Sequence, residues 1–120
     1  MSAHTSRSER FAPFDVVIVP FPYADRLAEK RRPAIVISAN RLARQHRLVW
    51  LLMVTSAENR RWHGDVDVSD LKLAGLPAPS LVRPAKIATA DAARVIRRIG
   101  RLAAKDAETV RRNLVSLIAS

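Results

Sequence analysis

Short runs rich in valine, isoleucine and leucine recur along the chain, and this feature most limits what it can fold into. Prolines or charged residues bound the runs, a pattern typical of β-strands. Strands are predicted over residues 14–21, 33–38, 48–55, 65–68 and 81–89. Several short strands joined by short loops favour a small barrel. All of the runs are far too short to span a membrane.

One amphipathic helix is predicted at the C-terminal end. Acidic residues near its start suit the positive end of a helix dipole, and a polar face accompanies an apolar one. The apolar face comprises Ala107, Val110, Leu114, Leu117 and Ile118, and the face predicted to meet solvent comprises Arg111, Arg112 and Asn113.

Three further segments are less sharply defined. Residues 95–102 fit a helix by spacing, but their β-branched content and Gly100 fit a strand equally well. Residues 40–47 form either a helical turn or a loop. Residues 71–80 contain a glycine and two prolines and are predicted to be connection. The fold class is mainly β, or α+β by content.

The 120 residues are expected to form one domain. Only 5% of them are aromatic, so the core depends on aliphatic side chains. Residues 1–12 are polar and charged and are predicted to be a flexible arm, which leaves 13–120 as the single barrel domain.

Charge gives the first indication of function. The chain has 21 Lys and Arg against 11 Asp and Glu, a formal net charge of +10, and no cysteine. A strongly basic surface attracts polyanions, nucleic acid first and an acidic protein second. The lack of cysteine excludes disulfides and thiolate nucleophiles and suits a reducing cytoplasm, where we expect this protein to act.

Three segments in order resemble the MazF/PemK family of type II toxin–antitoxin toxins. They are residues 14–22 (FDVVIVPFP), residues 30–38 (KRRPAIVIS) and residues 81–87 (LVRPAKI) continued by 98–102 (RIGRL). Between them, Thr55 stands where the family carries its threonine, twenty-three residues after Arg32. The resemblance implies an SH3-like, PemK-type barrel of about five to seven strands with a C-terminal helix.

The resemblance also implies an activity and partners. Family members are endoribonucleases that cleave single-stranded RNA without a metal or other cofactor, form homodimers and are inhibited by an acidic antitoxin. Arg32 and Thr55 are then the catalytic residues. The chain departs from the family in having Phe14 where a glycine is usual, and no glycine in residues 23–31, which correspond to a loop beside the RNA groove.

Elementary chemistry agrees with part of this assignment. RNA cleavage by the 2′-hydroxyl needs alignment with the phosphorus and stabilisation of charge on the phosphorane oxygens. Arg32 can hold two phosphate oxygens, and Thr55 can donate a further hydrogen bond. An antiparallel hairpin would bring both to one end of the barrel. Arginine is a poor base near neutral pH, so the proton acceptor stays open.

Other residues are weaker candidates for substrate binding. The basic loop carries Trp62, which can stack on a base or cover the barrel rim, and His63, which can accept a proton or lie near a phosphate. No histidine pair has metal-ligand spacing. Asp65, Asp67 and Asp70 fit the solvated face of a strand better than a cation site. The full substrate-binding set is Arg31, Ser56, Arg60, Arg61, Trp62 and His63.

Two other functions fit the same sequence. A non-catalytic SH3-like module could bind RNA or DNA through the same basic surface. An interaction protein could use the surface only to capture an acidic partner. In the binding module several arginines would contribute equally and Thr55 would have no special role.

Overall fold

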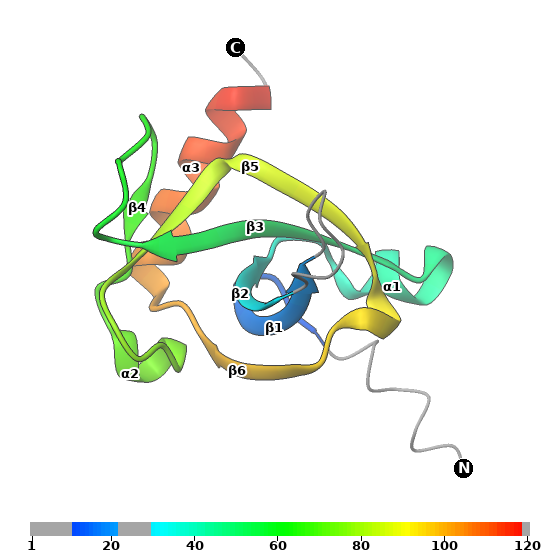
Figure 1. The fold of residues 1–120 in the computed structure, drawn as a ribbon. Helices are drawn as coiled ribbons and strands as arrows, with labels where there is room; N and C mark the ends of the chain where they lie inside the picture. The colour runs from blue at the N-terminus through cyan, green and yellow to red at the C-terminus, as the bar shows by residue number, and fades with distance from the viewer. Residues whose placement is uncertain (1–10, 22–29, 119–120) are drawn as a thin grey trace.

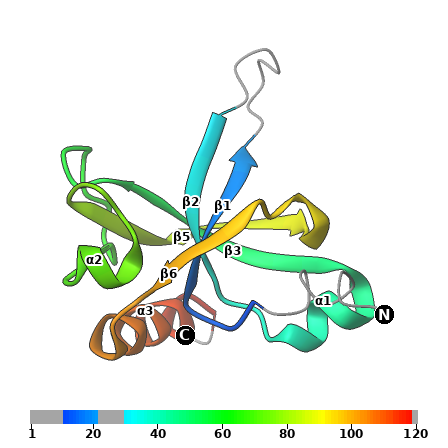
Figure 2. The same cartoon turned by 90° about the horizontal axis from the view of Figure 1, so that it is seen from below.

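Six strands form one antiparallel sheet that curls on itself into a half-barrel, as seen in the computed structural model (Figures 1 and 2). The structure describes residues 11–21 and 30–118. The sheet order is β4-β5-β3-β2-β1-β6. The strands are β1 (Asp15–Phe21), β2 (Lys30–Val36), β3 (Leu48–Ser56), β4 (Val66–Asp67), β5 (Ser80–Asp91) and β6 (Arg97–Arg101).

Four helical segments complete the described structure. They are α1 (Asn40–His46), α2 (Leu71–Ala74), the 3-10 helix η3 (Ala92–Arg94) and α3 (Ala104–Ile118). The predicted mainly β barrel with a C-terminal helix is therefore confirmed. None of these helices has the length and apolarity needed to cross a membrane.

Two hydrophobic clusters lie on opposite faces of the curled sheet. Side chains alternate along β3, so Leu52 and Val54 join one cluster while Val49 and Leu51 join the other. Val110 of α3 is fully buried in the first cluster. Burial of these aliphatic side chains is the main force that holds the sheet curled.

The ambiguous segments take definite forms. Residues 97–101 are strand β6 rather than helix, because they pair with β1. The predicted connection 71–80 contains the short helix α2, begun by Asp70, whose carboxylate accepts the Leu73 N–H at 3.0 Å. Of residues 40–47, for which the prediction left a helical turn or a loop, Asn40–His46 form helix α1. The predicted strand over 65–68 is reduced to β4.

The predicted faces of the C-terminal helix need correction at three residues. Asn113 does not face solvent, because its Nδ2 donates a hydrogen bond to the Gly64 carbonyl at 3.0 Å. Leu117 and Ile118 are 59% and 72% exposed, so neither reaches the core. The helix extends past the sheet at this end (Figure 1).

A close approach between α2 and β6 explains two of the glycines. A Cβ at Gly100 would lie 2.4 Å from the carbonyl carbon of Ala74, and one at Gly75 would lie 2.1 Å from the Ile99 carbonyl oxygen. Gly75 also has a φ of +74°, which favours glycine. Both positions therefore exclude any side chain.

The N-terminal segment is described only in part. Residues 1–10 of the predicted arm, with His4, lie outside the described residues, as do residues 22–29 between β1 and β2. Phe11, which the prediction placed in the arm, is 7% exposed and packs in the cluster that contains Leu51.

Candidate functional site

A small polar pocket of about 90 Å³ lies where β2, β3 and β5 meet. Three of its residues carry positive charge. It is lined by Arg32, Met53, Val54, Thr55, Arg83 and Lys86. The structure thus brings together the two residues that the sequence singled out, Arg32 and Thr55.

Strand register explains why these two side chains meet. β2 and β3 pair antiparallel with Ala34 opposite Met53. Continuing that register by two residues places Arg32 opposite Thr55, on the same face of the sheet. β3 then pairs with β5, with Met53 opposite Arg83, which adds a third strand to the pocket.

Thr55 is held by a neighbour in the next loop. The Asn59 Nδ2 donates a hydrogen bond to the Thr55 Oγ1. A hydroxyl that accepts in this way still has its own O–H to donate. Thr55 is therefore oriented while its proton can point at an anion in the pocket.

Arg31 and Ser56 are placed differently from their neighbours. Successive residues of a strand point to opposite faces, so Arg31 and Ser56 lie on the face opposite Arg32 and Thr55. Neither lines the pocket. The Ser56 Oγ accepts the backbone N–H of Glu58 at 3.1 Å and so helps to shape the following turn.

A buried ion pair fixes the basic loop that follows β3. The Arg83 Nη2 donates to the Asp65 Oδ2 at 2.8 Å and to the Arg60 carbonyl at 2.7 Å. Its guanidinium lies 4.0 Å from the centroid of the Trp62 ring. The side chain of Asp65 is fully buried and that of Arg83 is 10% exposed. We call this group of Arg83, Asp65 and Trp62 the loop clamp.

The loop clamp changes the ionisation of Asp65. Burial raises the pKa of this carboxyl, but hydrogen bonds from the Arg83 side chain and the Trp62 backbone N–H lower it, helped by the charges of Arg83 and Arg61. The net effect holds the pKa of Asp65 below its ordinary value of 3.8. The pair is thus ionised at neutral pH.

The prediction that the three aspartates form one solvated face of a strand is wrong for two of them. Asp65 is buried in the loop clamp, and Asp70 begins α2. Only Asp67 of the three fits that prediction, since its exposed carboxylate accepts from Arg61 at 2.8 Å. No group of three histidine, aspartate or glutamate side chains within residues 11–21 and 30–118 is arranged to hold a metal.

The basic loop itself borders the pocket without entering it. Arg60, Trp62 and His63 are exposed, and Arg61 is half exposed and paired with Asp67. One face of the Trp62 ring is covered by Arg83. This contact favours the structural role for Trp62 on that face, where the sequence left stacking on a base as the alternative.

Arg83 and Lys86 are the functional candidates that the sequence analysis missed. Both lie in the quoted segment 81–87, but nothing in their spacing relates them to Arg32. The signal that could have found Arg83 is its strand position, because an arginine within an apolar β-run needs a buried partner. Asp65, eighteen residues earlier, supplies that partner.

Chemically, the pocket suits a phosphate group. Arginine presents several N–H donors in a planar fork, lysine adds a compact charge, and a threonine hydroxyl completes the donor set. Because the pocket is small and partly enclosed, its electrostatic interactions are stronger than in bulk water.

Solved structures define the class of protein that has this fold. MazF of Deinococcus radiodurans matches with a TM-score of 0.72 at 22% identity, over 91% of this chain and 96% of that one. A MazE–MazF complex of the same organism matches with a TM-score of 0.69 at 20% identity, over 90% of this chain and 94% of that one. An endoribonuclease in complex with its cognate antitoxin, from a mycobacterial species, matches with a TM-score of 0.71 at 15% identity, over 89% of this chain and 93% of that one. The fold is that of the MazF toxins.

The family model for PemK-like, MazF-like toxins of type II toxin–antitoxin systems matches residues 12–118. The chain belongs to this family, as the sequence resemblance predicted, and is a toxin of a type II toxin–antitoxin system. Among curated protein sequences, no match is found.

Proposed function

We propose that the protein is a metal-independent endoribonuclease that cleaves single-stranded RNA. The observation that carries this proposal is the meeting of Arg32 and Thr55 in one cationic pocket. Family membership supports it, since a mycobacterial protein of the same fold is described as an endoribonuclease. We assign catalysis to Arg32 and Thr55, and we expect the protein to act in the cytoplasm.

The reaction begins with attack of a 2′-oxygen on the adjacent phosphorus. A new P–O bond forms to the 2′-oxygen, which gives up its proton, and the bond from phosphorus to the 5′-oxygen breaks. The departing 5′-oxygen takes a proton, so the products are a cyclic phosphate and a 5′-hydroxyl. Arg32 and Thr55 stabilise the charge that develops on the two non-bridging oxygens.

Arg32 acts as a fixed cation in this scheme. A guanidinium is a permanent cation with several N–H donors, so Arg32 serves electrostatics and positioning. Lys86 adds positive charge at the same pocket and can neutralise a neighbouring phosphate. Arg83 points its guanidinium into the loop clamp and so supports the pocket wall rather than the reaction.

The test is incubation of the purified chain with a long RNA in the presence of EDTA. We expect the RNA to be cut at discrete positions, whereas a single-stranded DNA of matched sequence stays intact because it lacks the 2′-hydroxyl. Analysis of the new ends should show cyclic phosphates. Binding of RNA by the folded protein without any cutting would reject the proposal in favour of a non-catalytic nucleic-acid-binding module.

An antitoxin is the second proposed partner. Two of the three solved structures named above are complexes of a toxin with its antitoxin. The net charge of +10 suits an acidic segment that would compete with RNA for the Arg32–Thr55 pocket. We therefore expect a cognate acidic antitoxin to inhibit this chain.

We also propose a homodimer. Three large apolar side chains lie exposed on adjoining parts of β3 and β5, namely Leu48, Trp50 and Ile87. Three more, Val115, Leu117 and Ile118, are exposed in the second half of α3. Exposed apolar area of this kind marks a protein interface.

Substitution of Trp50 with glutamate is expected to convert the dimer to a monomer, because a charge would be buried in an apolar interface. Light scattering coupled to size exclusion measures the mass directly. Lys72→Glu on α2 is the matched control and should leave the mass unchanged. A wild-type chain that is monomeric at micromolar concentration would contradict the homodimer.

A further inference from the structure

Three arginines of helix α1 and its C-cap form a basic surface away from the Arg32–Thr55 pocket. We call Arg41, Arg44 and Arg47 the α1 arginines. All three are exposed, and none forms an ion pair with an acidic side chain in the part of the chain that the structure describes. Residues 30–57 contain no aspartate or glutamate, so the segment that carries these cations has no acid to neutralise them.

The sheet brings one acid to this end of the molecule. Asp91 pairs with Leu48, the first residue of β3 after α1. Its carboxylate accepts the backbone N–H of Ala93 at 2.9 Å and so caps η3. The charge of the α1 arginines is therefore directed to solvent.

Two of the α1 arginines occupy positions that the helix itself disfavours. Arg47, the C-cap, has a left-handed backbone with a φ of +59°, a conformation that favours glycine. Arg41 lies in the first turn, where the helix dipole favours acidic residues. Departures from such local preferences are expected at functional sites. Helix stability therefore does not explain why arginine stands at these two positions.

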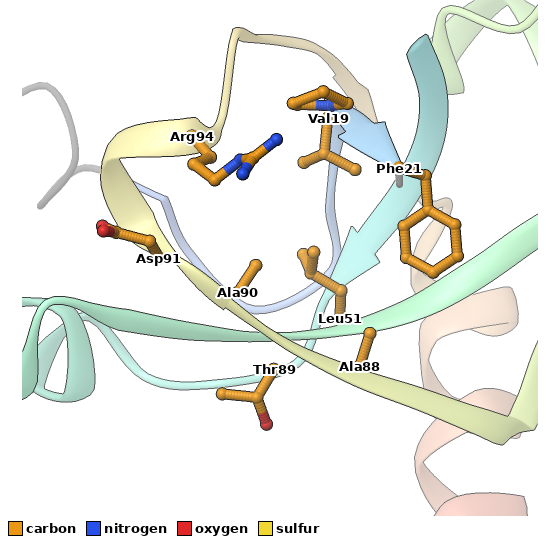
Figure 3. Close-up of a pocket in the computed structure, with 9 residues that line it drawn as sticks. Val19, Phe21, Leu51, Ala88, Thr89, Ala90, Asp91 and Arg94 are labelled. Carbon is orange, nitrogen blue, oxygen red and sulfur yellow. The ribbon is translucent and has the colours of Figure 1, made fainter. Parts of the chain in front are cut away.

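Strand β3 joins the α1 arginines to the catalytic pocket. The strand begins just after α1 and carries Thr55 at its far end (Figure 1). From Leu48 to Thr55 it extends about 23 Å. Along its middle, Leu51 lines a cavity of about 300 Å³ together with Ala88 and Ala90 of β5 (Figure 3). The α1 arginines are thus too far away to take part in cleavage, but a strand of RNA that continues past the cut can reach them.

We propose that the α1 arginines bind phosphates of the RNA strand beyond the cleaved bond, without reading its sequence. This inference rests on the proposed RNA substrate. A guanidinium holds phosphate oxygens through paired N–H donors, and Arg41 and Arg44, three residues apart, are neighbours on the helix surface. Each bound phosphate releases condensed counterions, so these contacts add affinity and salt dependence but no base preference.

An acidic protein segment is the other polyanion that this surface could attract. A disordered segment that folds on binding needs apolar contacts to offset its loss of conformational entropy. The exposed side chains of α1 are all polar, because Leu42 is half-buried and Ala43 is buried. Binding of an RNA backbone needs only cations. The surface therefore favours RNA over a folding peptide.

Binding of a 2′-O-methyl RNA of about thirty nucleotides tests the proposal, because this RNA lacks the attacking hydroxyl and stays intact. The α1 variant carries Arg41→Gln, Arg44→Gln and Arg47→Gly. We expect its dissociation constant to rise about fivefold to fiftyfold. The slope of log K against log salt should become shallower by about two, since each phosphate of a single strand contributes about 0.7. Fluorescence anisotropy at several salt concentrations measures both quantities.

The matched control carries Lys72→Gln, Arg101→Gln and Lys105→Gln. These exposed cations lie on α2, β6 and α3, and the control loses as many positive charges as the α1 variant. Its affinity for the RNA should stay within about twofold of the wild type. Equal losses in both variants would overturn the proposal, because net charge alone would then explain them. So would weaker binding of a poly-glutamate peptide by the α1 variant at unchanged RNA affinity, which would assign the surface to an acidic protein.

Arg47→Gly alone tests whether the arginine is kept for binding. Glycine adopts the left-handed backbone without strain, so the melting temperature should rise by about 2–6 °C. The affinity for the same RNA should nevertheless fall by about twofold to fivefold. A lower melting temperature, or unchanged RNA affinity, would overturn the role of Arg47.

Cleavage and binding together separate this inference from the proposed function. If the wild type cuts no RNA but the α1 variant binds the 2′-O-methyl RNA more weakly than the control does, the phosphate-binding surface holds and the ribonuclease function fails. If the wild type cuts RNA and both variants bind alike, the ribonuclease function stands and this inference is wrong. With a cleaving wild type, we expect the α1 variant to raise KM and to leave kcat unchanged.

Discussion

Arg32→Ala is expected to slow RNA cleavage by about a hundredfold to a thousandfold while the fold is retained. Loss of one preorganised donor to a developing oxyanion has a cost of this size. Thr55→Val should have a similar effect, because it removes the hydroxyl and keeps the shape of the side chain. Single-turnover cleavage of a defined RNA measures the rate, and a thermal melt checks the fold.

Arg31→Ala is the matched comparison for this experiment. It removes the same charge one residue earlier, but its side chain lies on the opposite face of β2. We expect the cleavage rate of Arg31→Ala to fall by less than about tenfold, because a screened surface charge contributes no more than this. If Arg32→Ala cleaves RNA as fast as Arg31→Ala, the assignment of catalysis to this pocket is wrong.

Asp65→Asn is expected to lower the free energy of unfolding by about 3–5 kcal/mol at neutral pH. The substitution leaves the guanidinium of Arg83 largely buried without its counter-charge, and breaking a buried pair from one side has this cost. Denaturant unfolding followed by circular dichroism measures the change. The loop that carries Arg60 and Trp62 should also lose protection from hydrogen exchange.

Asp67→Asn serves as the control on the same loop. Its ion pair with Arg61 is exposed, since the Asp67 side chain is 66% accessible and that of Arg61 52%. We therefore expect the free energy of unfolding to fall by at most about 1 kcal/mol. The difference between the variants should depend on pH. Because folding lowers the pKa of Asp65 below 3.8, its stabilising effect is complete above that value and disappears as the pH falls through the lower folded-state pKa. Equal stability of both variants would show that the loop clamp contributes little.

The sequence was sufficient to predict the elements whose pattern is local. The Val- and Ile-rich runs became β1, β2, β3 and β5 because alternate side chains have a core on each face. The C-terminal helix followed from its apolar spacing. Residues 97–101 could not be decided locally, since only pairing with β1 makes them a strand.

The candidate site likewise contains residues that the sequence predicted and residues that only the folded structure brings together. The pair Arg32 and Thr55 was found from its spacing within a family resemblance, and the register of β2 on β3 accounts for their meeting. The partnership of Arg83 with Asp65 depends on β5 lying beside β4, a contact that no local pattern contains. The prediction that Asp65 lies on a solvated face of a strand is wrong for that reason.

The loop clamp has a consequence for how such toxins diversify. Arg83 lines the pocket and at the same time anchors the loop beside it. A substitution that altered the pocket at this position would also loosen the loop, so a variant with a new RNA preference would first have to survive a loss of stability. Lys86 lines the same pocket but is exposed and lies outside the loop clamp, so change there carries no such penalty. New target preferences should therefore arise first at this position.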